Sequence, residues 1–156
     1  MNTNFKMEPR ALLKYILGAS EGDIMYTLLS EYKNKSTDEF VSKTYIEIAL
    51  ATGLEWETIR ATINRMVKKG LLQKNLGIRE NHVCTYLKPE FNTSIYIEFA
   101  LQKLQSKQKV TNITNRNQAK DFIPEIINIL KSDSNILVAL GIIEREVSNN
   151  EPTSNA

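Results

Sequence analysis

Cysteine and histidine are nearly absent from the sequence. Cys84 and His82 are the single residues of their types among 156. One cysteine excludes an intramolecular disulfide and is typical of a protein from a reducing, cytoplasmic environment. The two residues stand two apart on one side of an expected strand, but a structural zinc site needs about four ligands. No other cysteine or histidine can complete the set, so we expect no metal site.

Long apolar runs and catalytic motifs are also missing. No run of about 18 apolar residues occurs, which excludes a membrane-spanning helix. The first residues, MNTNFKMEPR, lack the apolar segment of a signal peptide. Gly18 and Gly22 are not followed by the Lys-Ser/Thr pair of a phosphate-binding loop, and no motif places a catalytic partner beside His82. We expect a protein that is not an enzyme, binds no cofactor and contacts no membrane.

The chain has little excess of either charge, since its formal net charge is only +2. The distribution of charged residues along the chain is more informative than their sum. Residues 55–82 hold six Lys/Arg and three Glu, or +3, whereas residues 1–54 sum to −1 and residues 83–156 to 0. The whole positive excess therefore lies in one segment, as an electrostatic footprint on DNA requires.

That segment belongs to an expected helix-turn-helix. The first helix covers residues 45–51, with Thr44 and Glu47 spaced for a capping box. Gly53 can adopt the left-handed conformation of a sharp corner between two helices, and Leu54 would enter the core between them. The apolar residues of the first helix share one face: Tyr45, Ile48 and Ala49.

The second helix is expected over residues 55–69, where it would present a polar face to duplex DNA. Its apolar stripe follows helical spacing: Trp56, Ile59, Ile63, Met66 and Val67. The outer face carries residues expected to read or approach the major groove: Thr58, Arg60, Ala61, Asn64 and Arg65. Lys68 and Lys69 would hold phosphates, and Gly70 would end the helix.

A β-hairpin follows, with strands expected at residues 71–74 and 83–87 and a loop over residues 75–81. We interpret it as the wing of a winged helix-turn-helix. Lys74 and Arg79 are placed to contact the phosphate backbone, which fixes register without reading sequence.

The run YIEIALATGLEWETIRATINRMVKKGLLQKN, followed by GIRENHVCTYL, carries a family resemblance. It resembles the winged-helix domains of plasmid and phage replication proteins of Gram-positive bacteria, the replisome-organiser and DnaD-like group. It is also similar to winged-helix transcriptional regulators. The resemblance spans roughly a third of the chain and implies DNA binding in replication or in regulation of transcription.

Patterns on either side of this segment give the remaining elements. We expect helices over residues 9–17, from about 20 to 32, 92–105, 121–131 and 133–147, a short strand at 40–42 and a linker at 106–117. The expected organisation is a winged-helix domain over residues 8–91, a helical region over 92–147 and a disordered tail over 148–156.

The C-terminal helices are more apolar than a solvent-facing helix needs. We favour a dimerisation element built from Ile126, Leu130 and Leu137, and the alternative is that these helices complete the core of their own domain. A dimer would suit two recognition helices on successive half-sites.

Together these patterns predict a mainly α protein with a small β-hairpin wing and C-terminal helices. The expected function is sequence-specific binding of double-stranded DNA by a homodimer, in transcription regulation or in plasmid or phage replication and segregation. The alternative is a protein-interaction module that recruits a replication or partition protein.

Overall fold

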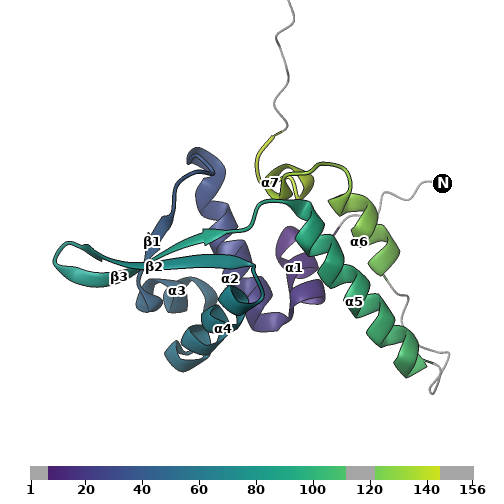
Figure 1. Ribbon diagram of the computed structural model, residues 1–156, viewed down its shortest axis with the longest axis horizontal. Helices are drawn as coiled ribbons and strands as arrows, with labels where there is room; N and C mark the ends of the chain where they lie inside the picture. The colour runs from purple at the N-terminus through teal and green to yellow at the C-terminus, as the bar shows by residue number, and fades with distance from the viewer. Residues whose placement is uncertain (1–6, 112–121, 145–156) are drawn as a thin grey trace, which may run out of the picture.

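The computed structural model describes residues 7–111 and 122–144. The chain is mainly α-helical, with a small three-stranded antiparallel sheet whose last two strands form a β-hairpin wing (Figure 1). The expected tail over residues 148–156 lies outside the described residues. In the described part of the chain, no helix has both the length and the apolar character needed to cross a bilayer.

Two helices at the N-terminus pack unusually closely. They are α1 (Pro9–Leu17) and α2 (Ala19–Ser30), followed by the 3-10 turn η1 (Glu31–Asn34). Pro9 occupies the first turn of α1, where no N–H is needed. At Gly22 a Cβ atom would stand 2.4 Å from the Cα of Lys14. A glycine at this position therefore lets the two helix backbones touch.

The helix-turn-helix is present as predicted. Helix α3 (Tyr45–Thr52) begins with the Thr44–Glu47 capping box, and Gly53 adopts a φ of 78° before α4 (Trp56–Lys68). Trp56, which the sequence placed on the apolar stripe of this helix, is 46% exposed and packs edge-to-face with the ring of Tyr45 rather than in the core. Trp56 is the first residue of α4. The neighbouring helices do not fully cover this end of the apolar stripe.

The sheet has the strand order β1-β3-β2, with β1 (Val41–Lys43), β2 (Leu72–Arg79) and β3 (His82–Pro89) all antiparallel. The hairpin is longer than predicted, since the loop expected over residues 75–81 shrinks to Glu80 and Asn81. Both turn residues have positive φ, 55° and 68°, as a two-residue hairpin turn requires. Gly77 is part of β2 and not of the turn.

The C-terminal helices are α5 (Thr93–Thr111), α6 (Ile123–Leu130) and α7 (Ile136–Ala139). The linker expected from residue 106 was misplaced, because α5 continues to Thr111, and residues 112–117 lie outside the described residues. The last helix was also predicted too long. It is capped by Asn135 and ends at Ala139, before Gly141 takes a φ of 75°.

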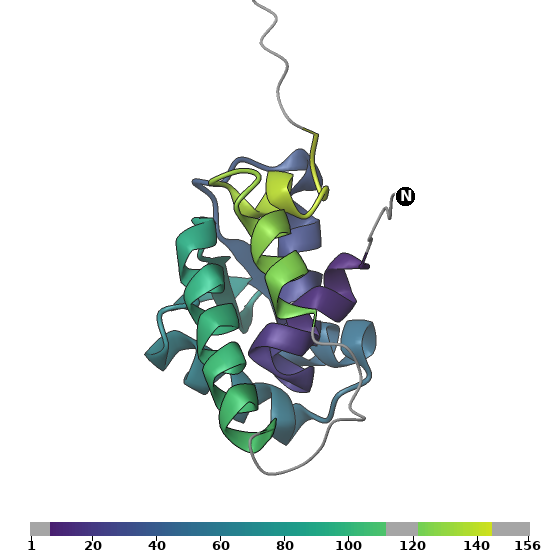
Figure 2. The ribbon, with the colours of Figure 1, turned by 90° about the vertical axis from the view of Figure 1, so that its right-hand side faces the viewer.

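One hydrophobic cluster runs from Leu12 in α1 to Leu140 after α7. Helices α5 and α6 lie side by side on the end of the molecule that α1 occupies (Figure 2). The interface predicted from Ile126, Leu130 and Leu137 was wrong, because each of these side chains has no exposed surface in the single chain. They fill the core under α5 and cannot meet a second copy without unfolding.

Candidate nucleic-acid interface

The outer face of α4 holds most of the predicted contact residues. Ile59, Ile63 and Met66 anchor the helix in the core. The opposite face is exposed and carries Arg60, Ala61, Asn64 and Lys68, whereas Thr58 is half-buried on its flank. The structure therefore brings together five of the nine predicted residues, counting half-exposed Arg65, along one side of α4.

Arg65 is bound to an acidic residue of α2. Its Nε and Nη2 atoms both donate to Oε2 of Glu21 at 3.3 Å, and Nη2 also donates to Oγ1 of Thr62 at 3.2 Å. The Glu21 side chain is only 12% exposed, whereas that of Arg65 is 50% exposed. The guanidinium thus neutralises a largely buried carboxylate while one side of it faces solvent. No sequence pattern predicted this pair, because its members lie 44 residues apart.

Arg60 is held more loosely. Its Nη2 atom lies 3.1 Å from Oε1 of Glu57, one turn earlier, and its guanidinium lies 5.9 Å from the centre of the Trp56 ring. Both ends of the Arg60–Glu57 pair are well exposed. Exposed pairs of this kind contribute little free energy, about 0–1 kcal/mol. A phosphate could therefore replace Glu57 as the partner of Arg60 at small cost.

The wing is joined to α4 through Lys74. Its Nζ atom donates to Oδ1 of Asn64 at 3.1 Å. This contact puts one cation of β2 beside the exposed face of α4. An ammonium group has three donors, so Lys74 can keep Asn64 and still bind an anion.

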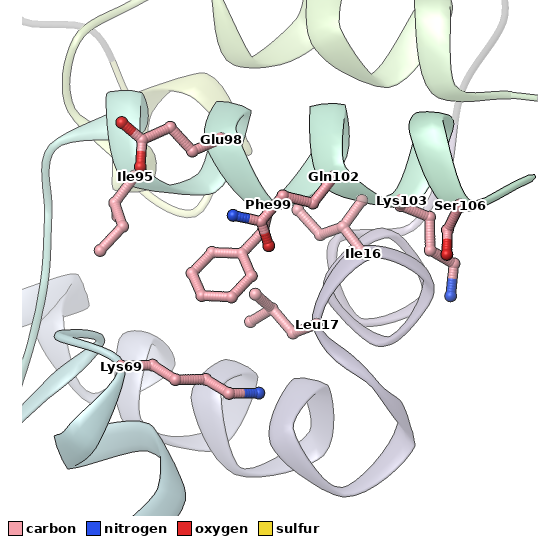
Figure 3. Close-up of a pocket in the computed structure, with 9 residues that line it drawn as sticks. All are labelled: Ile16, Leu17, Lys69, Ile95, Glu98, Phe99, Gln102, Lys103 and Ser106. Atoms are coloured by element: carbon pink, nitrogen blue, oxygen red, sulfur yellow. The ribbon is translucent and has the colours of Figure 1, made fainter.

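Lys69 lies apart from the other predicted residues. Its ammonium stands 5.9 Å from the centre of the Phe99 ring of α5. Figure 3 shows its side chain running beneath Phe99 and Leu17, along an open cavity of about 500 Å³ between α1, α5 and the end of α4. Lys103 lines the same cavity. The structure thus places Lys69 toward α5 rather than along the α4 face.

Arg79 fastens the wing to the start of α3. Its Nη2 atom lies 2.8 Å from Oε2 of Glu47, and Nη1 donates to the carbonyl oxygen of Ser42 at 3.2 Å. Oε1 of Glu47 meanwhile accepts from the backbone N–H of Thr44 at 2.9 Å. One carboxylate therefore caps α3 and holds the wing, and we name this set of contacts among Arg79, Glu47, Ser42 and Thr44 the wing latch.

The wing latch makes stability depend on pH. The hydrogen bond from the Thr44 backbone lowers the pKa of Glu47 below its ordinary value of 4.5, and the hydrogen bond from Arg79 lowers that pKa further. A carboxylate with a depressed pKa stabilises the fold above its unfolded-state pKa and loses that contribution as pH falls through the folded-state value.

We expect the free energy of unfolding of the wild type to exceed that of Glu47→Gln by a constant amount near neutral pH. The difference should shrink as pH falls below about 4.5. Urea denaturation of both proteins across this range measures it. A difference that does not change with pH would show that the Glu47 charge contributes nothing to the latch.

Most of the exposed apolar side chains lie on the elements that carry the predicted contact residues or adjoin them. The described residues include seven large hydrophobic side chains that are exposed: Ile46, Leu50, Trp56, Leu76, Ile78, Val83 and Leu101. All but Leu101 belong to α3, the start of α4 or the wing. Sequence reasoning missed this surface, although the alternation of apolar residues at 76 and 78 with small or polar neighbours is a signal of one exposed strand face.

Comparisons with known proteins identify no relative. No protein-family model, no curated protein and no solved structure matches this chain. The resemblance to replication proteins and transcriptional regulators therefore stays a prediction.

Proposed function

We propose that this protein binds double-stranded DNA through the outer face of α4 and the wing. The observation that carries the proposal is the arrangement of Arg60, Asn64 and Lys68 along one exposed helix face with Lys74 beside it. Exposed Ala61 lies in the middle of this face and would let the helix backbone approach a groove closely. A helix of this kind fits the major groove, and a hairpin beside it can follow the backbone.

Eight of the nine predicted contact residues take a role in this proposal, and half-buried Thr58 takes none. Asn64 and Arg60 suit base edges, and Lys68 and Lys74 suit phosphates. Arg65 can contribute through its exposed side while it stays on Glu21. Arg79 acts by positioning the wing, since both of its terminal nitrogens bind groups within the protein. Lys69, which lies by α5, is a peripheral phosphate contact in this proposal.

The biological setting that we propose is regulation of transcription, or plasmid or phage replication and segregation, in the cytoplasm. A homodimer fits such roles because two recognition helices can then meet two half-sites about one helical turn apart. The buried C-terminal residues cannot supply its interface, so the dimer requires another surface.

Titration of fluorescent duplex DNA at several salt concentrations tests the proposal. Each neutralised phosphate adds about 0.9 to the slope of log affinity against log salt. We expect Lys68→Ala to weaken binding and to reduce the slope by about 0.9. Lys131→Ala, an exposed lysine after α6, serves as the matched control and should leave both unchanged. Absence of binding at low salt, or equal effects of the two variants, would contradict the proposal.

A protein-interaction module is the second candidate function. The exposed side chains of Ile46 and Leu50 on α3 and of Trp56 at the start of α4 favour it, because large exposed apolar groups on neighbouring elements are typical of protein contacts. Binding through these groups would depend weakly on salt, whereas DNA binding should depend on it steeply. A replication or partition protein is the partner class that we infer for this alternative.

A further inference from the structure

The outer edge of the wing has no partner strand. In the described part of the chain, β2 pairs with β3 on one side and with nothing on the other. Its pairing with β3 is continuous from Leu72 to Arg79, without a bulge. Proteins usually blunt a free edge with proline, bulges or outward charges, and β2 contains neither a proline nor a bulge.

The two basic side chains of β2 already have partners within the chain. Lys74 is bound to Asn64 on α4, and Arg79 is bound to Glu47 in the wing latch. The outer part of the strand instead presents apolar side chains on one face. Leu76 and Ile78 are each 70% exposed, and Val83, which stands opposite Ile78 on β3, is 72% exposed.

The backbone of β2 is ready to accept another strand. Pro89 has no N–H and stands opposite Leu72, so Leu72 belongs to a pair that is not hydrogen-bonded. Because such pairs alternate along an antiparallel ladder, the backbone groups of Lys74, Leu76 and Ile78 point to the free edge. The carbonyl oxygen of Ile78 accepts a long hydrogen bond of 3.5 Å from the Tyr86 hydroxyl, which a new strand would replace. Figure 1 shows the hairpin extending beyond the helices, so the outer part of this edge is accessible.

We propose that the occupant of this edge is β2 of a second copy of the chain, in antiparallel register with Gly77 of both copies on the two-fold axis. Edge-to-edge pairing then joins two three-stranded sheets into one of six strands. This inference goes beyond DNA binding and supplies the dimer interface that the C-terminal helices cannot.

The register follows from which residues then stand opposite one another. Leu76 faces Ile78 of the second copy, and Lys74 stands beside Glu80 of the second copy, so unlike charges meet and no like charges do. Leu76 and Ile78, whose backbone groups both point to the edge, then face each other, as a hydrogen-bonded pair requires. On the axis the two Cα atoms approach to about 4.5 Å, which glycine tolerates. The exposed aliphatic side chains of both copies share one face and cover each other.

Light scattering of the full chain from micromolar to near-millimolar concentration tests the interface. We expect the wild-type mass to double as concentration rises and Ile78→Glu to keep the mass of one chain. Leu50→Glu is the matched control, because Leu50 is exposed apolar surface on α3, and it should dimerise like the wild type. Circular dichroism should show all three folded, since both positions are exposed.

Disulfide formation tests the register. In a hydrogen-bonded pair the Cα atoms lie about 5.5 Å apart, within disulfide range. A mixture of L76C and I78C proteins should therefore cross-link between the two variants more than either does with itself. Preferred self-linking of L76C would overturn the register.

Three results would overturn the interface. A wild type that stays monomeric at every concentration would show that this edge does not pair with a second copy, and a strand of another protein would then be its partner. A dimer that survives Ile78→Glu, or one that Leu50→Glu also abolishes, would place the interface elsewhere. DNA binding is measured separately by titration, so failure of either proposal can be recognised without the other.

Discussion

Leu137→Glu is expected to abolish the folded state rather than to produce a folded monomer. Leu137 lies in α7 with no exposed surface, in the cluster that α5, α6 and α1 share. Truncating such a leucine costs about 2–5 kcal/mol, and an unpaired buried carboxylate costs several more. The total stability of a domain is only about 5–15 kcal/mol, so the substitution should remove most or all of it.

Circular dichroism melting and urea denaturation measure this effect. Leu137→Ala should remain folded, with the unfolding free energy lowered by about 2–5 kcal/mol. Leu101→Glu is the control, since this side chain on α5 is 43% exposed, and it should change stability by less than about 0.5 kcal/mol. A Leu137→Glu protein with the melting temperature of the wild type would show that α7 does not belong to the core.

Gly22→Ala is expected to be strongly destabilising even though alanine favours helices. Alanine gains about 1 kcal/mol of helix propensity over glycine. Its Cβ would, however, stand 2.4 Å from both Cα and N of Lys14. These are backbone atoms, so α1 must shift away from α2, and overpacking of this kind costs about 1–3 kcal/mol or more.

The expected net loss is about 2 kcal/mol, the clash outweighing the propensity gain. For a chain of this size that corresponds to a melting temperature lower by about 4–8 °C. Ser20→Ala, in the first turn of the same helix, is the control and should change little. An alanine variant more stable than the wild type would mean that α1 and α2 can separate without loss.

Local signals predicted the helix-turn-helix well because they act within a few residues. The Thr44–Glu47 capping box and the left-handed Gly53 depend on neighbours three or four positions away, and both are present. The apolar spacing of α1 and α4 likewise predicted correctly which faces of these helices are buried, apart from Trp56 at the start of α4.

The wing was predicted less accurately because glycine suggested a turn. Gly77 lies within β2, where the Tyr86 ring covers it, and a Cβ would stand 2.5 Å from that ring. The turn is made by Glu80 and Asn81, whose positive φ values the sequence signals only weakly. A glycine that makes room for a ring looks the same in sequence as a glycine that makes a turn.

The partners of the arginines could not be predicted, because they arise from tertiary structure. Glu21 reaches Arg65 from α2, and Glu47 reaches Arg79 from α3 across 32 residues of sequence. A basic residue on an outer face therefore did not mean a basic residue available to a ligand. The same holds for Leu137. Its apolar character predicted that it is buried, but not whether its own chain or a second copy covers it.

The wing latch also has an entropic consequence. A free β-hairpin of this length is marginally stable and would sample many orientations relative to α4. Arg79 and Glu47 restrict those orientations before any partner arrives, so the conformational entropy of the wing is lost during folding and not during association. A partner that contacts the wing together with α4 then meets a preorganised surface, and its dissociation constant should rise when Arg79→Ala frees the hairpin.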